Sequence, residues 1–323
     1  MTGDSLHGAQ ILVLGGLGFI GSNLTAALHA RGARVTILTP SRERHETLAR
    51  TFDAKAVQVV EGDIRDQGLM LDLIPGQDLI FNMSGQSGAV RSMEDPWTDL
   101  DVNCRGNLNV LEAMRARNQH AKVVFAGSRL QYGKPQATPV GEDAPKRPRS
   151  LHAIHKQTVE EYFKLYGELF EIRFSVARIT NPYGPGQAHG RTAYGIINRL
   201  IQLATAGEPL TIYGDGGQLR DYVHIDDVVA ALMALAESPQ ADGACLNVGS
   251  GVGRRLVDVA TDIVGLAGRG SIQHVEWPRL AEQIETGDFV ADISRITRDI
   301  GWTPSIALAE GLAQTVEFYK RHT

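Results

Sequence analysis

Hydrophobic residues along this chain gather in short runs, and longer helix-like stretches of mixed apolar and polar residues separate the runs. Short runs that are apolar almost throughout are typical of strands buried on both faces of a parallel sheet. The predicted strands cover residues 11–14, 35–38, 57–60, 78–81, 122–126 and 174–178. Strands that alternate with helices predict an α/β fold, a doubly wound parallel sheet of the Rossmann type with right-handed crossovers.

The pattern changes after about residue 180. A loop rich in glycine and proline, NPYGPGQAHGR, precedes a predicted helix near 193–206 and the short strand TIYGD. The segment HIDDVVAALMALAES predicts another long helix, and short elements follow CLNVGS. We expect these later segments to form a smaller α/β C-terminal lobe that caps the sheet and is interleaved with it.

Composition narrows the classes of function. With 323 residues, 43% of them hydrophobic, the chain is long enough to bury a large core. A net charge of −5 argues against nucleic acid and membrane surfaces as partners. Cys104 and Cys245 form no disulfide framework, which fits a reducing compartment. The start MTGDSLHGAQ lacks signal-peptide features and no apolar stretch is long enough to span a membrane, so a cytoplasmic location is expected.

The first predicted strand leads into GGLGFIGSNL, which carries Gly15, Gly18 and Gly21 at G-x-x-G-x-x-G spacing. Glycine at these places allows a tight turn, close approach of the backbone to a pyrophosphate, and close packing of helix on strand. Phe19 and Ile20 open the following helix, whose N-terminus faces the negative charge. Because strand and helix supply the required context, the loop predicts a dinucleotide site rather than an ordinary turn.

The end of the second predicted strand bears on the choice of dinucleotide. NAD-preferring proteins usually carry an acid there, which binds the ribose hydroxyls. In this chain Thr39 takes that place, and Ser41, Arg42 and Arg44 follow it. A neutral residue with arginines nearby suits a 2′-phosphate, since arginine binds phosphate through two parallel hydrogen bonds. The pattern favours NADP over NAD, although a solvated, charged loop explains it equally well.

Eight segments between about residues 10 and 320 together resemble the extended short-chain dehydrogenase/reductase family, in its nucleotide-sugar epimerase and dehydratase branch. They are GGLGFIGSNL, EGDIRD, FNMSGQSG, SMEDPWTDLDVNCRGNLNVLEA, RITNPYGPGQ, TIYGDGGQLRDYVHIDDVV, LNVGSG and DISRITRDIGWTPSIALAEGL. The resemblance implies a nucleotide-diphosphate sugar as ligand and a homodimer through helices near 103–117 and 156–167. It also implies two units: an NAD(P)-binding Rossmann domain, residues 1–178 with about 221–240, and a nucleotide-sugar-binding lobe, residues 179–220 and 241–323.

The resemblance assigns binding residues one by one. On the cofactor side they are Asp63 and Ile64 at the adenine, Asn82, Ser84 and Gly85 in a loop past the ribose and pyrophosphate, and Asn103 and Lys156. On the substrate side they are Gln86, Ser87, Ser128, Arg129, Asn181 and Arg220, the last resembling the arginine that binds the diphosphate. Plainer alternatives exist: Asp63 caps a turn, Asn103 satisfies backbone groups, and Arg220 is a surface charge.

The resemblance also implies the chemistry, which in this family is hydride transfer at a sugar carbon. A Tyr-x-x-x-Lys pair and a Ser or Thr move the hydroxyl proton, and the lysine holds the nicotinamide ribose. Ser128 and Lys156 match two of these groups, and His152 stands in place of the tyrosine. Residues four apart lie on one helical face. Imidazole titrates near neutrality and Lys156 lowers its pKa, so His152 can serve as a neutral base.

Three interpretations of His152 remain open. In the first, which we favour, it does the tyrosine's work, with Ser128 or a water bridging its shorter reach. In the second, catalysis has moved to another group and His152 only shapes the pocket. In the third, the protein binds a nucleotide sugar without turnover. A metal site built on His152 and His155 is disfavoured, because no third ligand suggests itself.

The two residues after Ser128 bear on the reaction. The family's 4,6-dehydratases carry Asp-Glu there, whereas this chain has Arg129 and Leu130, and neither is a general acid at neutral pH. Dehydration is therefore disfavoured. The motifs favour an NDP-sugar epimerase that acts through a transient keto-sugar. An NADPH-dependent keto-sugar reductase and a catalytically silent sugar-nucleotide-binding homologue are the alternatives.

Overall fold

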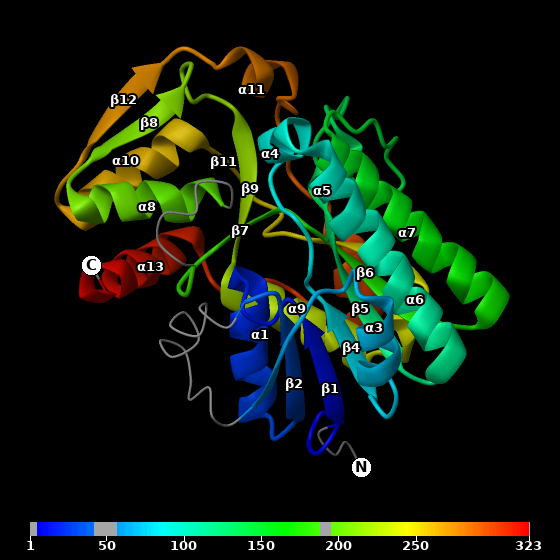
Figure 1. Cartoon of the computed structure of the whole chain (residues 1–323). Helices are drawn as coiled ribbons and strands as arrows, with labels where there is room; N and C mark the ends of the chain where they lie inside the picture. Colours follow the sequence, from blue (N-terminus) through cyan, green and yellow to red (C-terminus); the bar gives the residue numbers. More distant parts are fainter. Residues whose placement is uncertain (1–4, 42–56, 188–194, 323) are drawn as a thin grey trace.

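A seven-stranded parallel sheet organises the molecule (Figure 1). The computed structural model describes residues 5–41, 57–187 and 195–322. The sheet order is β10-β6-β5-β4-β1-β2-β3. Its strands are β1 (Gln10–Leu14), β2 (Arg34–Thr39), β3 (Gln58–Glu61), β4 (Leu79–Asn82), β5 (Lys122–Ser128), β6 (Arg173–Ile179) and β10 (Ala244–Val248). The first six confirm the predicted strands and the doubly wound α/β fold.

Helices cover both faces of this sheet, which is why its strands are apolar almost throughout. Alternate residues of β1 enter different cores: Ile11 and Val13 on one face, Leu12 and Leu14 on the other. Helices α1 (Phe19–Ala30) and α9 (Ile225–Glu237) pack on the first face. Helices α3 (Gln67–Leu73), α6 (Gly106–Arg117) and α7 (Leu151–Phe170) pack on the second.

A second, smaller assembly lies at the upper left of Figure 1. Strands β8 (Pro209–Tyr213) and β12 (Ser271–Val275) pair in parallel. Helices α8 (Ile196–Ala206), α10 (Leu256–Ala267) and α13 (Leu308–His322) share one apolar core with β8. A three-stranded sheet, in the order β11 (Gly253–Arg255), β9 (Leu219–His224) and β7 (Asn181–Tyr183), lies between this core and the large sheet. The short helices α11 (Arg279–Gln283) and α12 (Ser294–Ile300) complete the C-terminal part.

Two segments, β10 and α12, lie elsewhere than the predicted division of the chain suggests; Ile296 of α12 belongs to the core with α1 and α9. Residues 241–323 were grouped with the smaller lobe, yet residues 244–248 form β10, the edge strand of the large sheet. Ala244 pairs with Ser175 and Val248 with Ile179, in parallel register with β6. The run is short and apolar, like the other strands of this sheet, and four of its five residues are buried. Packing against β6 therefore decides its place, because position along the chain carries no such information.

A nearly continuous helical stretch crosses one side of the sheet and positions several polar side chains. It begins with α4 (Ala89–Glu94) and α5 (Pro96–Leu100), passes through a π-helical turn (Asp101–Arg105), and continues as α6. The Asp95 carboxylate accepts the Thr98 N–H at 3.2 Å, and Pro96 follows at the first helical position, so α5 has a well-formed start. The π turn carries Asn103 inward, and such turns recur at functional sites.

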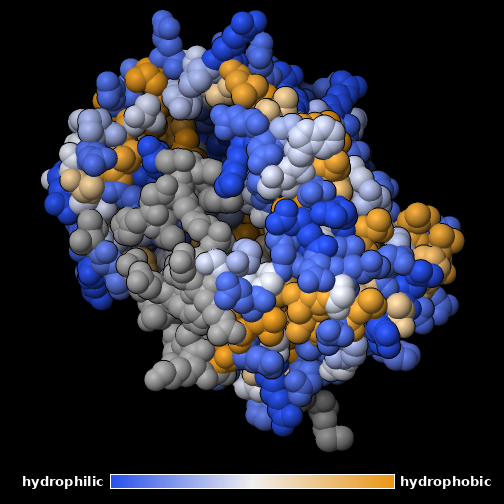
Figure 2. Space-filling model, in the orientation of Figure 1, coloured by the Kyte–Doolittle hydropathy of each residue, from blue (hydrophilic) through white to orange (hydrophobic). Residues whose placement is uncertain are grey.

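The surface, the helices and the cysteines add three observations. In Figure 2 the surface is hollowed between the part of the molecule that carries β8, β12 and α10 and the part that carries α4 and α5. No helix within the described residues is long and apolar enough to cross a membrane. Cys104 and Cys245 are both buried free thiols.

Candidate functional site

The turn after β1 has the geometry that its glycines predict. Gly15 has φ +77°, and a Cβ there would lie 2.9 Å from the carbonyl oxygen of Met83, so only glycine fits. A Cβ on Gly21 would overlap the Gly15 carbonyl oxygen. A Cβ on Gly18, by contrast, would meet only that same oxygen at 3.2 Å and otherwise open space. The backbone at Gly18 is therefore accessible to a pyrophosphate at the start of α1, where Phe19 and Ile20 stand.

The loop after β4 passes the inner side of the helical stretch. Asn82 ends β4 and shapes the loop: its amide donates to Asn107 at 2.8 Å, and its carbonyl oxygen accepts the Ser84 hydroxyl at 2.5 Å. Gly85 has φ +150°, and a Cβ there would lie 2.5 Å from Asn103 Oδ1 and 3.5 Å from Lys156 Nζ. The chain can approach Asn103 and Lys156 so closely only because residue 85 is glycine.

Asn103 and Gln86 leave buried polar atoms free at this place. The Asn103 amide donates to the backbone carbonyl of Gln86 at 3.0 Å. Asn103 therefore does satisfy a backbone group, which was the plainer alternative to a role in cofactor binding. Its Oδ1, however, is buried without a hydrogen-bond partner among the described residues, and so is Gln86 Nε2. Buried polar atoms without partners are costly, and here they mark a position that suits a ligand. With the accessible Gly18 turn, these groups fit a dinucleotide.

The predicted adenine and ribose contacts have local structural partners. Asp63 accepts the backbone N–H of Arg65 at 2.8 Å and forms an ion pair with the Arg65 guanidinium, which is the turn-capping alternative. Burial works to raise the pKa of Asp63, but the bonds from Arg65 outweigh it and hold that pKa below its ordinary value. Ile64 is buried, and the Thr39 hydroxyl donates to the Ser41 carbonyl at 3.1 Å. Arg42 and Arg44 lie outside the described residues.

The three predicted proton-transfer residues come from two elements. Ser128 ends β5, and its hydroxyl oxygen accepts the Leu130 N–H at 3.2 Å. His152 and Lys156 lie on one face of α7, which begins after the N-cap Ser150. The Lys156 ammonium donates to the Ala126 carbonyl on β5 at 2.9 Å and lies 4.5 Å from the centre of the Phe125 ring. Both α7 side chains are almost fully buried, 5% exposed for His152 and 7% for Lys156.

A buried ion pair fixes the position of α7 against the sheet. Glu160, one turn after Lys156, accepts two hydrogen bonds from the Arg178 guanidinium on β6, at 2.9 and 2.7 Å. Burial would raise the pKa of Glu160, but Arg178 and Lys146 hold it at about 2, so the carboxylate stays charged. The paired bonds give one geometry for the helix face that carries His152 and Lys156.

Burial sets the protonation of this face. Burial lowers the pKa of Lys156 to about 8, a value at which the ammonium form still dominates at neutral pH. Burial likewise lowers the pKa of His152; the Asp99 carboxylate opposes this, and the Lys156 cation adds to it. His152 is therefore a neutral imidazole at pH 7, the form that accepts a proton.

Asp99 is a member of this cluster that the sequence analysis did not identify. This fully buried carboxylate on α5 lies 2.5 Å from Nδ1 of His155 and 3.8 Å from Nδ1 of His152. The available signal was its spacing: Asp99 stands four residues before Asn103, so the two share one face if the helix predicted near 103–117 extends back to residue 99. Its pairing with α7, more than fifty residues later, carries no local signal.

Three of the predicted substrate residues meet around the segment Glu285–Phe289. Arg129 donates to the Thr286 hydroxyl at 3.0 Å and to Asn181 Oδ1 at 3.4 Å. Arg220 pairs with Glu285 and donates to the Gly287 carbonyl, so it is not a free surface charge. Burial and the nearby Arg220 cation lower the pKa of Arg129 to about 9, and its hydrogen-bond partners in the described chain are neutral. Glu285 already neutralises Arg220, so Arg129 is the guanidinium of this group whose described hydrogen-bond partners are all neutral, and it suits an anion.

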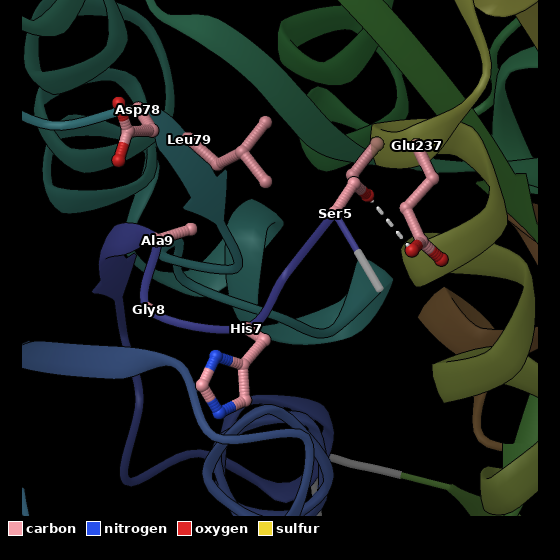
Figure 3. A pocket seen from close by; sticks show the side chains of 8 residues that line it. Ser5, His7, Gly8, Ala9, Asp78, Leu79 and Glu237 are labelled. Atoms are coloured by element: carbon pink, nitrogen blue, oxygen red, sulfur yellow. Dashed lines mark hydrogen bonds between the residues drawn. The ribbon is translucent and has the colours of Figure 1, made fainter. Parts of the chain in front are cut away.

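A shallow hollow of about 520 Å³ elsewhere on the surface is separate from this site. It lies at the amino ends of β1 and β4, whereas the glycine turn lies at the carboxyl end of β1. Figure 3 shows its lining, with the Ser5 hydroxyl donating to Glu237 at 2.9 Å. Ligands of open parallel sheets bind outside the carboxyl ends of the strands, so this hollow has no part in the site described above.

Comparison with known proteins gives one family throughout. Residues 11–249 match the NAD dependent epimerase/dehydratase family. A UDP-glucose 4-epimerase of Mycolicibacterium smegmatis is 35% identical over 96% of this chain and 98% of that protein. A dTDP-4-dehydro-6-deoxy-D-allose reductase of a Streptomyces species is 29% identical over 100% of this chain and 99% of that protein. The crystal structure of the UDP-glucose 4-epimerase of Thermus thermophilus in complex with NAD is 30% identical, covers 96% of this chain and 99% of that one, and superposes with a TM-score of 0.85.

The open space at Gly18 generates the first prediction. In Gly18→Val the new Cβ lies 3.2 Å from the Gly15 carbonyl oxygen and the side chain extends into the space expected for the pyrophosphate, so we expect dinucleotide affinity to fall by about tenfold or more. Isothermal titration with NAD measures the loss, and thermal unfolding shows that the fold persists. Gly265→Val is the matched control, because a Cβ on Gly265 meets nothing within 4 Å. Unchanged NAD affinity in Gly18→Val contradicts the assignment of the turn.

Proposed function

Because the chain belongs to the NAD dependent epimerase/dehydratase family, we propose that it is an NDP-sugar epimerase that acts through a transient keto-sugar. The observation that carries the proposal is the adjacency of two sites. The Lys156 ammonium donates to the carbonyl of Ala126, two residues before Ser128 on β5, and the residue after Ser128, Arg129, donates to Asn181 and lies near Arg220. A sugar nucleotide bound by its diphosphate at the arginines places its sugar at the proton-transfer group.

The proposed site lies between two units of the chain. The cofactor unit is the large sheet with its helices: residues 1–178, about 221–240, and also β10 and α12. The sugar-nucleotide lobe is the rest of residues 179–220 and 241–323. Arg129 comes from the first unit, whereas Asn181, Arg220 and Thr286 come from the second. Gln86 and Ser87, in the loop after β4, are proposed to face the sugar.

Each residue has a part in the proposed reaction. The nicotinamide cofactor of the family supplies the chemistry of taking a hydride from the sugar carbon and returning it. Neutral His152 accepts the hydroxyl proton as the carbon is oxidised and gives it back on reduction. Lys156 keeps a positive charge beside this proton and orients the ribose, and the Ser128 hydroxyl bridges His152 and the sugar oxygen. Arg129 and Asn181 keep the sugar nucleotide oriented.

Two other reactions of the family fit less well. Dehydration needs a general acid after Ser128, and the buried guanidinium of Arg129 in that position cannot act as one. Reduction of a keto-sugar needs no change in the site, and the Streptomyces reductase spans the same length as this chain. It is therefore the second candidate. Binding without turnover is the third, since His152 departs from the family's tyrosine.

One experiment separates the three. The purified protein is incubated in D₂O with UDP-glucose, taken as the probe because the Mycolicibacterium relative is a UDP-glucose 4-epimerase. An epimerase forms UDP-galactose without added cofactor and without deuterium at the sugar carbon, since the same hydrogen returns to it. A reductase gives no product here but consumes NADPH with a 4-keto-sugar nucleotide. If sugar nucleotides bind in titrations but none of them undergoes either reaction, the silent homologue is established and the proposal is overturned.

The neutral state of His152 generates a pH prediction. The proton-accepting form grows as pH rises through the His152 pKa, which burial sets below its ordinary value. The rate of sugar oxidation therefore rises with pH and levels off by about pH 7. His152→Ala lowers kcat on the order of 10²-fold or more at every pH, and His152→Tyr retains part of the activity.

Lys156→Ala serves as the comparison, because it weakens cofactor binding as well as turnover, whereas His152→Ala leaves cofactor binding intact. Single-turnover rates from pH 5 to 9 and NAD titrations supply the two measurements. A wild-type rate in His152→Ala assigns proton transfer to another group.

The choice of cofactor rests on the loop after β2. The family and the Thermus structure are associated with NAD, and nothing in these comparisons supports a preference for NADP. The site accepts NAD or NADP on our proposal, and Arg42 and Arg44 are the residues that would bind a 2′-phosphate. If they do, replacing both with alanine weakens NADP binding far more than NAD binding in parallel titrations. Equal losses for both cofactors remove the case for NADP.

We also propose a homodimer through the helices near 103–117 and 156–167. Large apolar side chains are exposed along this side of the molecule: Leu165 and Leu169 on α7, and Trp97, 77% exposed, on α5. Figure 2 shows apolar side chains over α7 at the right of the view. Clustered exposed apolar residues of this kind mark interaction surfaces.

The double variant Leu165→Glu/Leu169→Glu tests the dimer, because two buried carboxylates in an apolar interface oppose association. Light scattering over a concentration series measures the mass. We expect the wild type at twice the chain mass and the variant at the chain mass. Leu266→Glu, on the exposed side of α10, is the control and stays with the wild type. A monomeric wild type contradicts the proposal.

A further inference from the structure

Two buried polar atoms face each other without a hydrogen bond at the centre of the site. Asp99 Oδ2 and His152 Nδ1 each have no hydrogen-bond partner in the described structure, and they lie 3.8 Å apart. The other carboxylate oxygen, Oδ1, lies 2.5 Å from Nδ1 of His155. A shift of less than 1 Å closes the remaining gap to a normal hydrogen bond and satisfies both atoms. One carboxylate on α5 thus faces two imidazoles on α7.

The position of Asp99 is firmly set. Its side chain is fully buried, α5 has a capped start at Asp95, and His155 occupies one of its oxygens. Burial works to raise the pKa of Asp99, but the facing His152 and His155 hold that pKa well below its ordinary value. Asp99 is therefore an anion over the working pH range, and an anion can only accept hydrogen bonds.

A histidine in place of tyrosine creates a requirement that tyrosine does not have. Tyrosine has a single oxygen, whereas neutral imidazole carries its proton on Nδ1 or on Nε2, and only the nitrogen without the proton is a base. We propose that Asp99 is the positioning residue that holds the proton of His152 on Nδ1 and so keeps Nε2 free as the proton acceptor. The catalytic part of this inference rests on the proposed role of His152 in sugar oxidation.

The groups around His152 come from three elements. Asp99 on α5 and the backbone of Gln86 in the loop after β4 raise the pKa of the imidazole, whereas Lys156 on α7 lowers it. His155, also on α7, is three residues away and faces the other oxygen of Asp99. Asp99 is the one carboxylate among these groups, and it faces Nδ1 rather than Nε2. Its pull on the proton therefore acts on one ring nitrogen only.

Asp99→Asn tests the assignment with almost no change in shape. An amide has one acceptor oxygen and one donor group, so it cannot accept from both histidines. With the oxygen on His155, the NH₂ group faces Nδ1 of His152, and the His152 proton moves to Nε2. We expect kcat to fall on the order of 10²-fold or more with KM little changed, since the base is lost while the binding groups remain. The remaining pH-dependent limb moves to lower pH, because the carboxylate that raised the His152 pKa is gone.

Nitrogen NMR of protein labelled at histidine gives a readout independent of turnover. Long-range N–H correlations distinguish the two tautomers, and the missing signals of His152→Ala assign residue 152. We expect the Nδ1–H form in the wild type and the Nε2–H form in Asp99→Asn. Asp101→Asn is the matched control: this acid on the π turn pairs with Arg105 at 3.2 Å, and the variant keeps the wild-type tautomer and kcat.

The outcomes separate the two proposals. A wild-type His152 with its proton on Nε2 overturns the inference, and this spectrum decides the matter even if Asp99→Asn does not fold. An unchanged tautomer in a folded Asp99→Asn overturns it as well. The Nδ1–H form in the wild type, its loss in Asp99→Asn, and absence of turnover with every sugar nucleotide support the role of Asp99 while the proposed function fails.

Discussion

The parallel register of the large sheet is the constraint on which the site depends. Because all seven strands run in one direction, their carboxyl ends meet at one edge. The glycine turn follows β1, the loop with Gly85 follows β4, and Ser128 and Arg129 follow β5. Helices on both faces leave this edge as the place where irregular backbone and polar side chains can gather. The glycine turn, the face of α7 with His152 and Lys156, and Arg129 therefore gather at one edge of the sheet, although they are far apart in sequence.

The site buries charges of both signs, including Asp99 and the Arg220–Glu285 pair, and two of its cations have hydrogen bonds only to neutral groups within the described residues. Lys156 and Arg129 are both almost fully buried, and their hydrogen bonds go to a carbonyl, a hydroxyl and an amide. An isolated buried cation is costly, and the lowered pKa values of both groups express that cost. On our proposal, the phosphate groups of a dinucleotide and the diphosphate of a sugar nucleotide offset this cost. The stability of the fold and the affinity for ligands are thus linked through the same side chains.

If His152 takes the place of the family's tyrosine, as we propose, its surroundings must supply something different. A tyrosine base needs its pKa brought down from about 10, whereas an imidazole near 6.5 is already neutral at pH 7. The histidine needs instead the correct tautomer and a fixed ring. Burial on α7, clamped to β6 through Glu160 and Arg178, fixes the ring's place, and the buried Asp99 faces its Nδ1. On our proposal, His152 and Asp99 act together as one chemical unit.

The sequence by itself determined the periodic and local features. Runs of apolar residues predicted six strands, because a strand that is buried on both faces of a sheet is apolar almost throughout. The glycine spacing predicted the turn that follows β1. The four-residue spacing of His152 and Lys156 predicted a shared helical face. The motifs predicted the family, which the match over residues 11–249 confirms.

Tertiary structure decided what depends on contacts between distant segments. The run at 244–248 joined the large sheet because β6 offered a free edge, which no local pattern reveals. The residue type of Arg129 alone showed that no general acid follows Ser128. Its position beside Arg220 and Asn181 became known only from the tertiary structure. Nothing in the local sequence distinguishes Asp99 from other acidic residues. The packing of α5 on α7 places its carboxylate beside the imidazoles of His152 and His155. Side-chain pairing across elements has no period in the sequence, and packing alone fixes it.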